Sequence, residues 1–476
     1  MNLCRIVLVL AVLCLLYPSA GLTVSSPLDS LMEDELLKSD INIQEFDQPL
    51  PQDDANEQYR RGLLLLRENK IEEGKKVFND LLAQDPKHIP SIIALAQIAY
   101  SAKQFDEAIR QTRRAIEIEP KNARLHVGLA QIYVAQNKIA DAEKAVQAAV
   151  KLDPDDPNWR VGHAQLLLLQ EKPNEAEAEI QTAARLAPTN YRPQMILGNL
   201  YSVQGRAEDA LKAYQAAITI DDLRPEPRLA AALTLARMNN VDGALEQADA
   251  LVQIATNSTD ARFQQLLPVG FTLKGALFNQ QNQIDAAIEQ YKKATQANFR
   301  YVLAHLSLGN AYLQKQNYEK ALESYNNALS VAPENPQAHL MLGQTYITMG
   351  KNDEARKAYE KVLSLNPNVP IAQNNLAWIY ADSGEKLEEA VQLAEAAKKV
   401  APKNVQILDT LGWVYYKKGE HQKALDNILA AVSVGANDPN IFYHLGLTYE
   451  ALGNASKAEE AYRKVRELDP NFEKLK

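Results

Sequence analysis

Residues 302–335 read VLAHLSLGNAYLQKQNYEKALESYNNALSVAPEN, and this stretch decides the fold of the chain. Its eighth residue is Gly309, its twentieth is Ala321 and its thirty-second is Pro333. The same 34-residue pattern occurs twelve times between Ala55 and Phe472. A repeat of this length indicates small helical units that stack on one another to bury a continuous core.

The eighth position of the repeat never carries a side chain larger than a methyl group. It reads Gly62, Ala96, Ala130, Ala164, Gly198, Ala232, Gly275, Gly309, Gly343, Ala377, Gly412 and Gly446. Residues this small allow two helices to cross at close range, and a larger side chain would push them apart. Tyrosine recurs at position twenty-four, and a proline usually ends the second helix. Each repeat is therefore predicted to be a hairpin of two helices.

These positions resemble those of the tetratricopeptide repeat (TPR) family over nearly the whole chain after residue 54. The resemblance implies an all-α fold, a right-handed superhelical solenoid of about twelve helical hairpins. It also implies a concave groove, lined by the first helix of each repeat, in which protein or peptide partners bind.

The repeat spacing divides the chain into consecutive segments. We predict a signal peptide at 1–21, an acidic linker at 22–54, repeats one to six at 55–258, an insertion at 259–267, repeats seven to twelve at 268–472 and a tail at 473–476. Repeat six lacks the usual aromatic residues and proline, and the insertion follows it directly. We therefore expect a hinge there, with faster hydrogen exchange than in the flanking helices.

The first segment has the composition of an export signal. Arg5 gives a positive start, residues 6–17 are apolar, and residues 19–21 are small enough for cleavage. A spanning helix needs roughly 20 apolar residues, so we expect removal near Gly21 and no transmembrane helix in the mature chain. This predicts an exported protein of the periplasm or cell envelope; retention of the segment as an anchor is the alternative. Lipidation at Cys14 is disfavoured because no small residue precedes it.

The linker at 22–54 is strongly acidic. It carries nine acidic side chains against the single base Lys38, and so accounts for most of the net charge of −9. This composition is typical of a largely disordered spacer. The alternative is that the apolar residues between Leu31 and Phe46 form a short element that docks into the groove of this protein or of a partner.

The sequence offers little for catalysis. It contains no zinc-protease signature, no phosphate-binding glycine loop and no nucleophile elbow, and both cysteines lie in the signal segment. The seven histidines are dispersed, and no arginine-rich stripe is present to contact phosphates. We predict that the protein is not an enzyme, holds no metal or cofactor and does not bind nucleic acid.

Position nine of the first helix is predicted to face the groove. At about 100° per residue, positions two, five, nine, twelve and thirteen lie opposite the packing face. In six repeats position nine is an amide: Gln97, Gln131, Gln165, Asn199, Asn310 and Gln344. Amides both donate and accept hydrogen bonds, which suits them to hold the backbone of an extended peptide. The alternative is a solvated polar face.

The C-terminal repeats carry aromatic residues at the same position. Position nine becomes Trp378 and then Trp413, and the neighbouring residues predicted to bind a partner are Tyr416, Tyr443, Asn374, Asp409, Asp382 and Lys417. Large aromatic side chains beside polar groups are typical of interface hot spots. We expect Asp382 and Lys417 to pair across the groove or to meet a charged ligand. The alternative is that both tryptophans pack against the neighbouring helix.

The segments 374–378 and 408–415 are similar to those of exported bacterial TPR proteins associated with exopolysaccharide and cell-envelope assembly. The resemblance implies a non-enzymatic protein–protein interaction scaffold in the bacterial cell envelope, in peripheral association with a membrane complex. Two alternatives stay open. One is an accessory subunit of a glycosyltransferase, polysaccharide synthase or export machine. The other is a self-associating structural array. Light scattering that shows a monomer at high protein concentration would count against this alternative.

Overall fold

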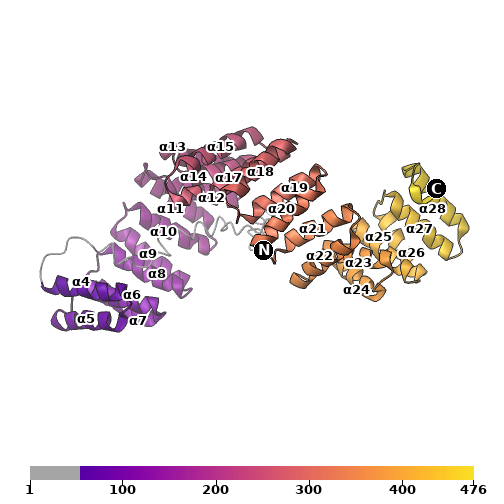
Figure 1. Ribbon diagram of the computed structural model, residues 1–476. Coiled ribbons are helices and arrows are strands. Elements are labelled where there is room, and N and C mark those ends of the chain that lie inside the picture. The colour runs from indigo at the N-terminus through magenta and orange to yellow at the C-terminus, as the bar shows by residue number, and fades with distance from the viewer. Residues whose placement is uncertain (1–53, 476) are drawn as a thin grey trace. The chain divides into compact units, whose positions relative to one another are not determined.

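The computed structural model describes residues 54–475, which form helices joined by short turns (Figure 1). No strand occurs in this part of the chain. The predicted all-α class and the helical hairpins are therefore confirmed. The signal peptide at 1–21 and nearly all of the acidic linker lie outside the described residues, so both stay predictions.

The chain divides into two compact units, one ending at Leu266 and the other beginning at Leu267. In the first unit the helix pairs are α4 (Asp54–Arg67) and α5 (Ile71–Gln84), α6 (Ile89–Ser101) and α7 (Phe105–Ile118), α8 (Ala123–Ala135) and α9 (Ile139–Leu152), α10 (Pro157–Leu169) and α11 (Pro173–Leu186), α12 (Arg192–Val203) and α13 (Ala207–Ile220), and α14 (Pro225–Arg237) and α15 (Val241–Asn257), followed by the short α16 (Ala261–Gln264). The boundary between the units falls within the insertion 259–267, and a hinge there stays a prediction.

The second unit continues the same pattern. Its pairs are α17 (Leu267–Gln280) and α18 (Ile284–Ala297), α19 (Val302–Gln314) and α20 (Tyr318–Val331), α21 (Pro336–Thr348) and α22 (Asn352–Leu365), α23 (Pro370–Ser383) and α24 (Leu387–Val400), α25 (Val405–Lys417) and α26 (His421–Ser433), and α27 (Pro439–Ala451) and α28 (Ala455–Leu468), with a 3-10 turn at Glu473–Leu475. First helices of successive repeats contact each other, as α23 does α25 and α25 does α27. These first helices therefore lie on a common face.

Position eight packs against position twenty-four of the same repeat. A Cβ added at Gly309 would lie 2.4 Å from Cε1 of Tyr325, and one at Gly198 would lie 2.3 Å from Cε1 of Tyr214. Tyr325 is completely buried. In repeat two, where position twenty-four is the smaller Thr112, position eight is Ala96, whereas in repeat eleven Gly412 faces Ile428. In the repeats with an aromatic residue at position twenty-four, the close helix crossing is therefore a contact between the aromatic ring and the backbone facing it.

The turn inside each repeat contains a residue with positive φ at position fifteen. These residues are Asn69, Lys103, Asn137, Glu171, Gly205, Asn239, Asn282, Gln316, Gly350, Gly384, Gly419 and Gly453, with φ between 56° and 85°. Glycine and asparagine adopt this left-handed conformation at low cost, and they hold most of these positions. The turn before Ala390, which is one residue longer, has a second such residue, Lys386, at φ 48°.

Polar side chains at position four join several repeats to the turn before them. Nε2 of His305 lies 2.8 Å from the carbonyl oxygen of Phe299, and Nε2 of Gln373 lies 2.8 Å from that of Pro367. Since a carbonyl only accepts, both nitrogens donate. Burial lowers the pKa of His305. This histidine therefore connects neighbouring repeats as a neutral ring.

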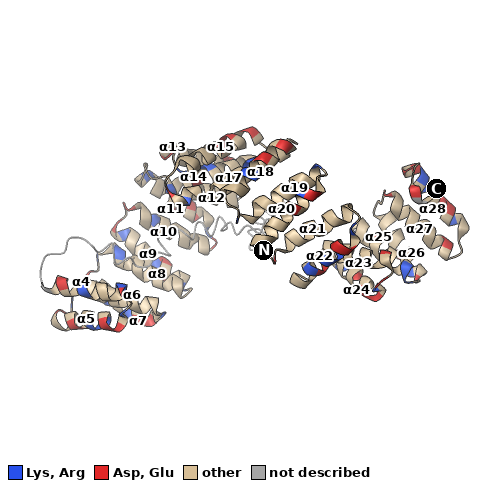
Figure 2. Cartoon of the chain, in the orientation of Figure 1, with Lys and Arg blue, Asp and Glu red and all other residues tan. Residues whose placement is uncertain are grey.

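Basic residues (blue) and acidic residues (red) are interspersed along the helices of both units (Figure 2). Within residues 54–475, every helix is too short or too polar to cross a bilayer.

Candidate functional site

A pocket of about 230 Å³ opens on the face that the first helices of the second unit form. Its walls are contributed by α21, α23, α25 and α27. The residues that line it are Ile347, Asn374, Asn375, Trp378, Gln406, Asp409, Thr410, Asp438 and Ile441. We call this cavity the first-helix pocket. It lies on the face that the sequence predicts to bind partners.

Three of the predicted partner-binding residues meet in the first-helix pocket. Asn374 and Trp378 come from α23 and Asp409 comes from α25, so the side chains of two successive repeats converge there. All three are half-buried. Side chains at positions five and nine therefore do reach one common surface.

The polar groups of α23 are only partly satisfied within the protein. Nδ2 of Asn374 donates to Oδ1 of Asn375 at 3.2 Å, and Nδ2 of Asn375 donates to the hydroxyl of Tyr359 at 2.9 Å. Oδ1 of Asn374 is buried and accepts no hydrogen bond. A buried acceptor without a hydrogen-bond partner costs free energy. The pocket wall therefore contains one acceptor, Oδ1 of Asn374, that a ligand could satisfy.

Two carboxylates stand on the opposite wall. Asp438 caps α27, and its Oδ1 accepts hydrogen bonds from the backbone nitrogen of Asn440 at 2.8 Å and from Nδ2 of the same residue at 3.0 Å. Asp409 accepts from Nδ1 of His444, which lies 3.0 Å from its Oδ1 and 3.2 Å from its Oδ2. Each carboxylate keeps lone pairs that are directed to no donor of the protein. The pocket is therefore acidic.

Trp413 belongs to an aromatic cluster beside the pocket and does not line it. Its ring stacks on His444 with centroids 4.3 Å apart and on Tyr416 with centroids 5.1 Å apart. Tyr443 lies 6.2 Å from His444, centroid to centroid. Both Trp413 and Trp378 also pack against the hydrophobic core of the second unit. Most contacts of the Trp413 side chain are therefore packing contacts within the protein. Trp378 packs against the core and also lines the pocket.

Lys417 and Asp382 lie apart from these groups. Nζ of Lys417 lies 5.4 Å from the centroid of the Trp413 ring, a cation–π contact within its own helix. Asp382 is exposed. No ion pair joins the two residues in the described part of the chain. The two residues therefore do not pair in this structure, and their contact with a charged ligand stays a prediction.

The amides at position nine are mostly buried. Gln97, Gln131, Gln165 and Asn199 are between 2% and 9% exposed, whereas Asn310 and Gln344 are half-buried. Oδ1 of Asn199 accepts from the hydroxyl of Tyr214 at 2.8 Å, and Oδ1 of Asn310 accepts from that of Tyr325 at 2.7 Å. Asparagine at position nine therefore pairs with the tyrosine at position twenty-four. That the amides also hold a peptide stays a prediction.

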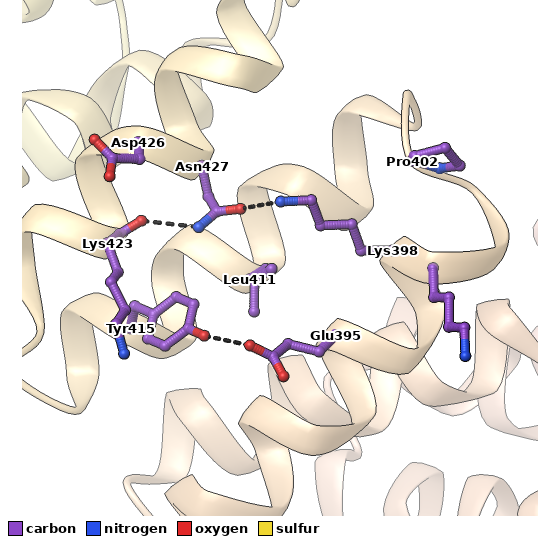
Figure 3. A pocket seen from close by; sticks show the side chains of 9 residues that line it. Glu395, Lys398, Pro402, Leu411, Tyr415, Lys423, Asp426 and Asn427 are labelled. Atoms are coloured by element: carbon purple, nitrogen blue, oxygen red, sulfur yellow. Dashed lines mark hydrogen bonds between the residues drawn. The ribbon is translucent and has the colours of Figure 1, made fainter.

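A second pocket, of about 440 Å³, opens between α24, α25 and α26 (Figure 3). It is lined by Glu395, Lys398, Lys399, Pro402, Leu411, Tyr415, Lys423, Asp426 and Asn427. The hydroxyl of Tyr415 donates to Oε1 of Glu395 at 2.5 Å, and Nζ of Lys398 donates to Oδ1 of Asn427 at 2.8 Å. Burial and the neighbouring carboxylate raise the pKa of Tyr415 to about 12. The polar side chains here bind mainly to one another, which leaves fewer of them for a partner.

Several residues that line the first-helix pocket are not predicted from the sequence. Asp438 sits in the turn before α27, and the groove pattern applies only to helical positions. Asn375 and Thr410 are at position six and Ile441 is at position three, which the pattern assigns neither to the packing face nor to the outward face. Gln406 and Ile347 occupy positions two and twelve, so the pattern of outward positions does contain them. The missing signal is the displacement of one repeat relative to the next, which only the structure gives.

Residues 228–474 match the family model described as the cilia and flagella-associated protein 70 C-terminal domain. Residues 102–166 and 161–225 each match a model described as a tetratricopeptide repeat.

Curated relatives match over short stretches. The general transcriptional corepressor trfA of Dictyostelium discoideum is 30% identical over 92 residues, which cover 19% of this chain and 7% of that protein. Tetratricopeptide repeat protein 12 of Mus musculus is 36% identical over 58 residues, which cover 12% of this chain and 8% of that protein. The chain thus spans less than a tenth of the length of these relatives.

Solved structures match over longer stretches at low identity. The Cut9-Hcn1 hetero-tetramer of APC/C is 14% identical, with a TM-score of 0.38, and the match covers 81% of this chain and 95% of that one. A tetratricopeptide repeat protein from Parabacteroides merdae is 18% identical, with a TM-score of 0.40 and coverage of 53% and 95%.

Proposed function

This chain belongs to the tetratricopeptide repeat family, with residues 228–474 in the family of the cilia and flagella-associated protein 70 C-terminal domain, and we propose that it is a scaffold that binds protein or peptide partners through the first helices of its second unit. The observation that supports this site is the first-helix pocket. It combines Trp378 with two carboxylates and a buried amide oxygen that lacks a hydrogen-bond partner.

The two pockets of the second unit differ in what they leave for a partner. On the second-helix side, Tyr415 is bonded to Glu395 and Lys398 is bonded to Asn427. In the first-helix pocket, Asp409, Asp438 and Asn374 all keep acceptor capacity. Hot spots join an aromatic anchor to polar groups that a partner satisfies, and the first-helix pocket has that composition.

The pair formed by Asp409 and His444 supports the site and is not proposed to be catalytic. His444 is 6% exposed and does not line the pocket. Its ring is covered on one side by Trp413. A general base must come within hydrogen-bond reach of a substrate proton, and His444 has no such approach. It holds Asp409 and Trp413 in place, so we assign it a structural role in the proposed site.

The finer part of the proposal is export to the bacterial cell envelope, with a role in exopolysaccharide or envelope assembly. Its support is the signal pattern of the first 21 residues and the similarity of segments 374–378 and 408–415 to such proteins. Fractionation of the source cells, with N-terminal sequencing of the purified protein, tests the export step. A chain found in the cytoplasm with its N-terminus intact would contradict it.

A crosslinking pull-down from native cells tests partner binding. We compare the wild type with Trp378→Ala and with the matched control Trp159→Ala, which removes a half-buried tryptophan of the first unit. We expect Trp378→Ala to lose a specific partner that the wild type and the control retain. Circular dichroism must first show that both variants keep their helical content. An identical partner set for all three proteins would contradict the proposed site.

A further inference from the structure

We infer that the first-helix pocket receives a basic side chain, arginine before lysine, from an extended segment of the partner protein. This inference rests on the proposed function and names the chemistry of the ligand at the same site. Its basis is the charge of the pocket. Asp409 and Asp438 both line it, and none of its lining residues is basic.

The hydrogen-bonding capacity of the pocket favours a ligand that is rich in donors. Both hydrogen bonds to Asp438 use its Oδ1, so its Oδ2 faces no donor of the protein. Asp409 receives a single N–H, which its two oxygens share. A guanidinium group has five N–H donors and no acceptor, so it complements carboxylates at every hydrogen.

The buried amide oxygen of Asn374 also favours a ligand that donates hydrogen bonds. Oδ1 of Asn374 accepts no hydrogen bond, although the amide nitrogen of the same residue donates to Asn375. A donor carried in by a partner would satisfy this oxygen and remove the cost of its burial. A carboxylate from a partner would bring another acceptor beside two existing negative charges, and would be repelled.

The apolar walls suit the rest of an arginine side chain. Trp378, Ile347 and Ile441 stand beside the polar groups. Arginine stacks its planar guanidinium on aromatic rings and packs its methylene stem on apolar surface. The ammonium group of lysine is a compact, strongly hydrated charge with three donors, so it uses the ring and the second carboxylate less well.

The size of the pocket favours one side chain over a free small molecule. Small-molecule sites are typically about 300–1,000 Å³ and enclose their ligand. The first-helix pocket, at about 230 Å³, is smaller. It therefore fits a single side chain of a peptide whose backbone runs along the first helices.

Selection from a random peptide library displayed on phage tests the inference on the purified full-length protein. We select twelve-residue peptides on the wild type and on the double variant Asp409→Asn, Asp438→Asn. Asparagine keeps the N-cap of α27 and can still accept from His444, so the variant loses charge without losing these contacts. The control is Glu323→Gln, which removes one charge from an exposed residue of α20.

We expect peptides selected on the wild type and on the control to share an arginine that those selected on the double variant lack. The best peptide is then synthesised with citrulline in place of that arginine, which keeps the shape and removes the charge. Citrulline should raise the Kd about tenfold or more, and the double variant should raise the Kd of the arginine peptide by a similar factor.

Two outcomes would overturn the inference. Selected peptides without a shared basic residue would contradict it, and a shared lysine without arginine would contradict the assignment of a guanidinium. In either case Trp378→Ala distinguishes the two proposals. If it abolishes binding of the selected peptides, the proposed partner site stands and only the ligand chemistry fails. If binding survives Trp378→Ala, the site itself is wrong.

Discussion

The ring of Trp413 lies nearly parallel to that of His444, with centroids 4.3 Å apart and an angle of 20° between the planes. The two residues belong to α25 and α27, the first helices of successive repeats. Because Nδ1 of His444 also binds Asp409, one buried imidazole fixes a tryptophan and a carboxylate of the preceding repeat. The geometry of the first-helix pocket therefore depends on contacts between repeats.

Replacing this imidazole is expected to weaken the contact between the last two repeats. His444→Leu keeps a buried apolar side chain but leaves Asp409 without its donor, so the free energy of unfolding should fall by about 1–3 kcal/mol. Denaturant unfolding followed by tryptophan fluorescence measures this change. An unchanged midpoint, with unchanged emission from Trp413, would show that the imidazole has no such role.

Gly309→Ala is expected to destabilise the second unit. The new Cβ would lie 2.4 Å from the buried ring of Tyr325, and overpacking of this kind costs about 1–3 kcal/mol. Gly162→Ala is the matched control, because nothing lies within 4 Å of a Cβ added there. Alanine has the higher helix propensity, so the control should stabilise by about 0.5–1 kcal/mol. Thermal unfolding measures both changes, and shifts of the same sign would contradict the contact.

Glu171→Gly is expected to stabilise the first unit. Glu171 has φ 60°, a conformation that costs a residue with a side chain about 1–2 kcal/mol. The greater freedom of glycine in the unfolded chain offsets part of this gain, so we expect a net increase of about 0.5–1 kcal/mol. Gly205 holds the same position in the next repeat, and Gly205→Ala should have the opposite effect. Equal melting temperatures for both variants and the wild type would contradict this account of the turn.

Stability is expected to fall at alkaline pH because of the buried tyrosines. Burial raises the pKa of Tyr359 to about 12, whereas a tyrosine in the unfolded chain ionises near pH 10. The folded state holds this proton more tightly, so its contribution is fully present below about pH 10 and is lost as the pH rises toward 12. Denaturant unfolding between pH 8 and pH 11.5 measures the decline. Tyr359→Phe should make it shallower, and an equally steep decline would contradict this assignment.

Much of the fold can be predicted from the sequence because the repeat fixes it. The period places every helix pair, and the small residues of position eight mark the crossing. The pairing of Gly309 with Tyr325 was also present in the sequence, since glycine accompanies every aromatic residue at position twenty-four. The positive φ of position fifteen is harder to predict from the sequence. Lys103 and Glu171 hold this position in two repeats, so the preference for asparagine and glycine is not uniform.

The site is predicted less completely. Helical periodicity indicates which residues of one helix face outward, and so finds Asn374, Trp378 and Asp409. It does not give the displacement between successive repeats, which decides that Asp438 enters the pocket and that Trp413 stacks on His444. Neither contact has a signature within a single repeat.

Site-specific photocrosslinking in the source cells tests the central claim most directly. One variant of the chain carries a photoreactive amino acid in place of Gln406, in the first-helix pocket. A second variant carries it in place of Glu388, which is exposed on the second helix α24. If partners bind the first helices, the probe at position 406 should give a discrete crosslinked protein that the probe at position 388 does not give. A partner captured at position 388 and absent at position 406 would contradict the account.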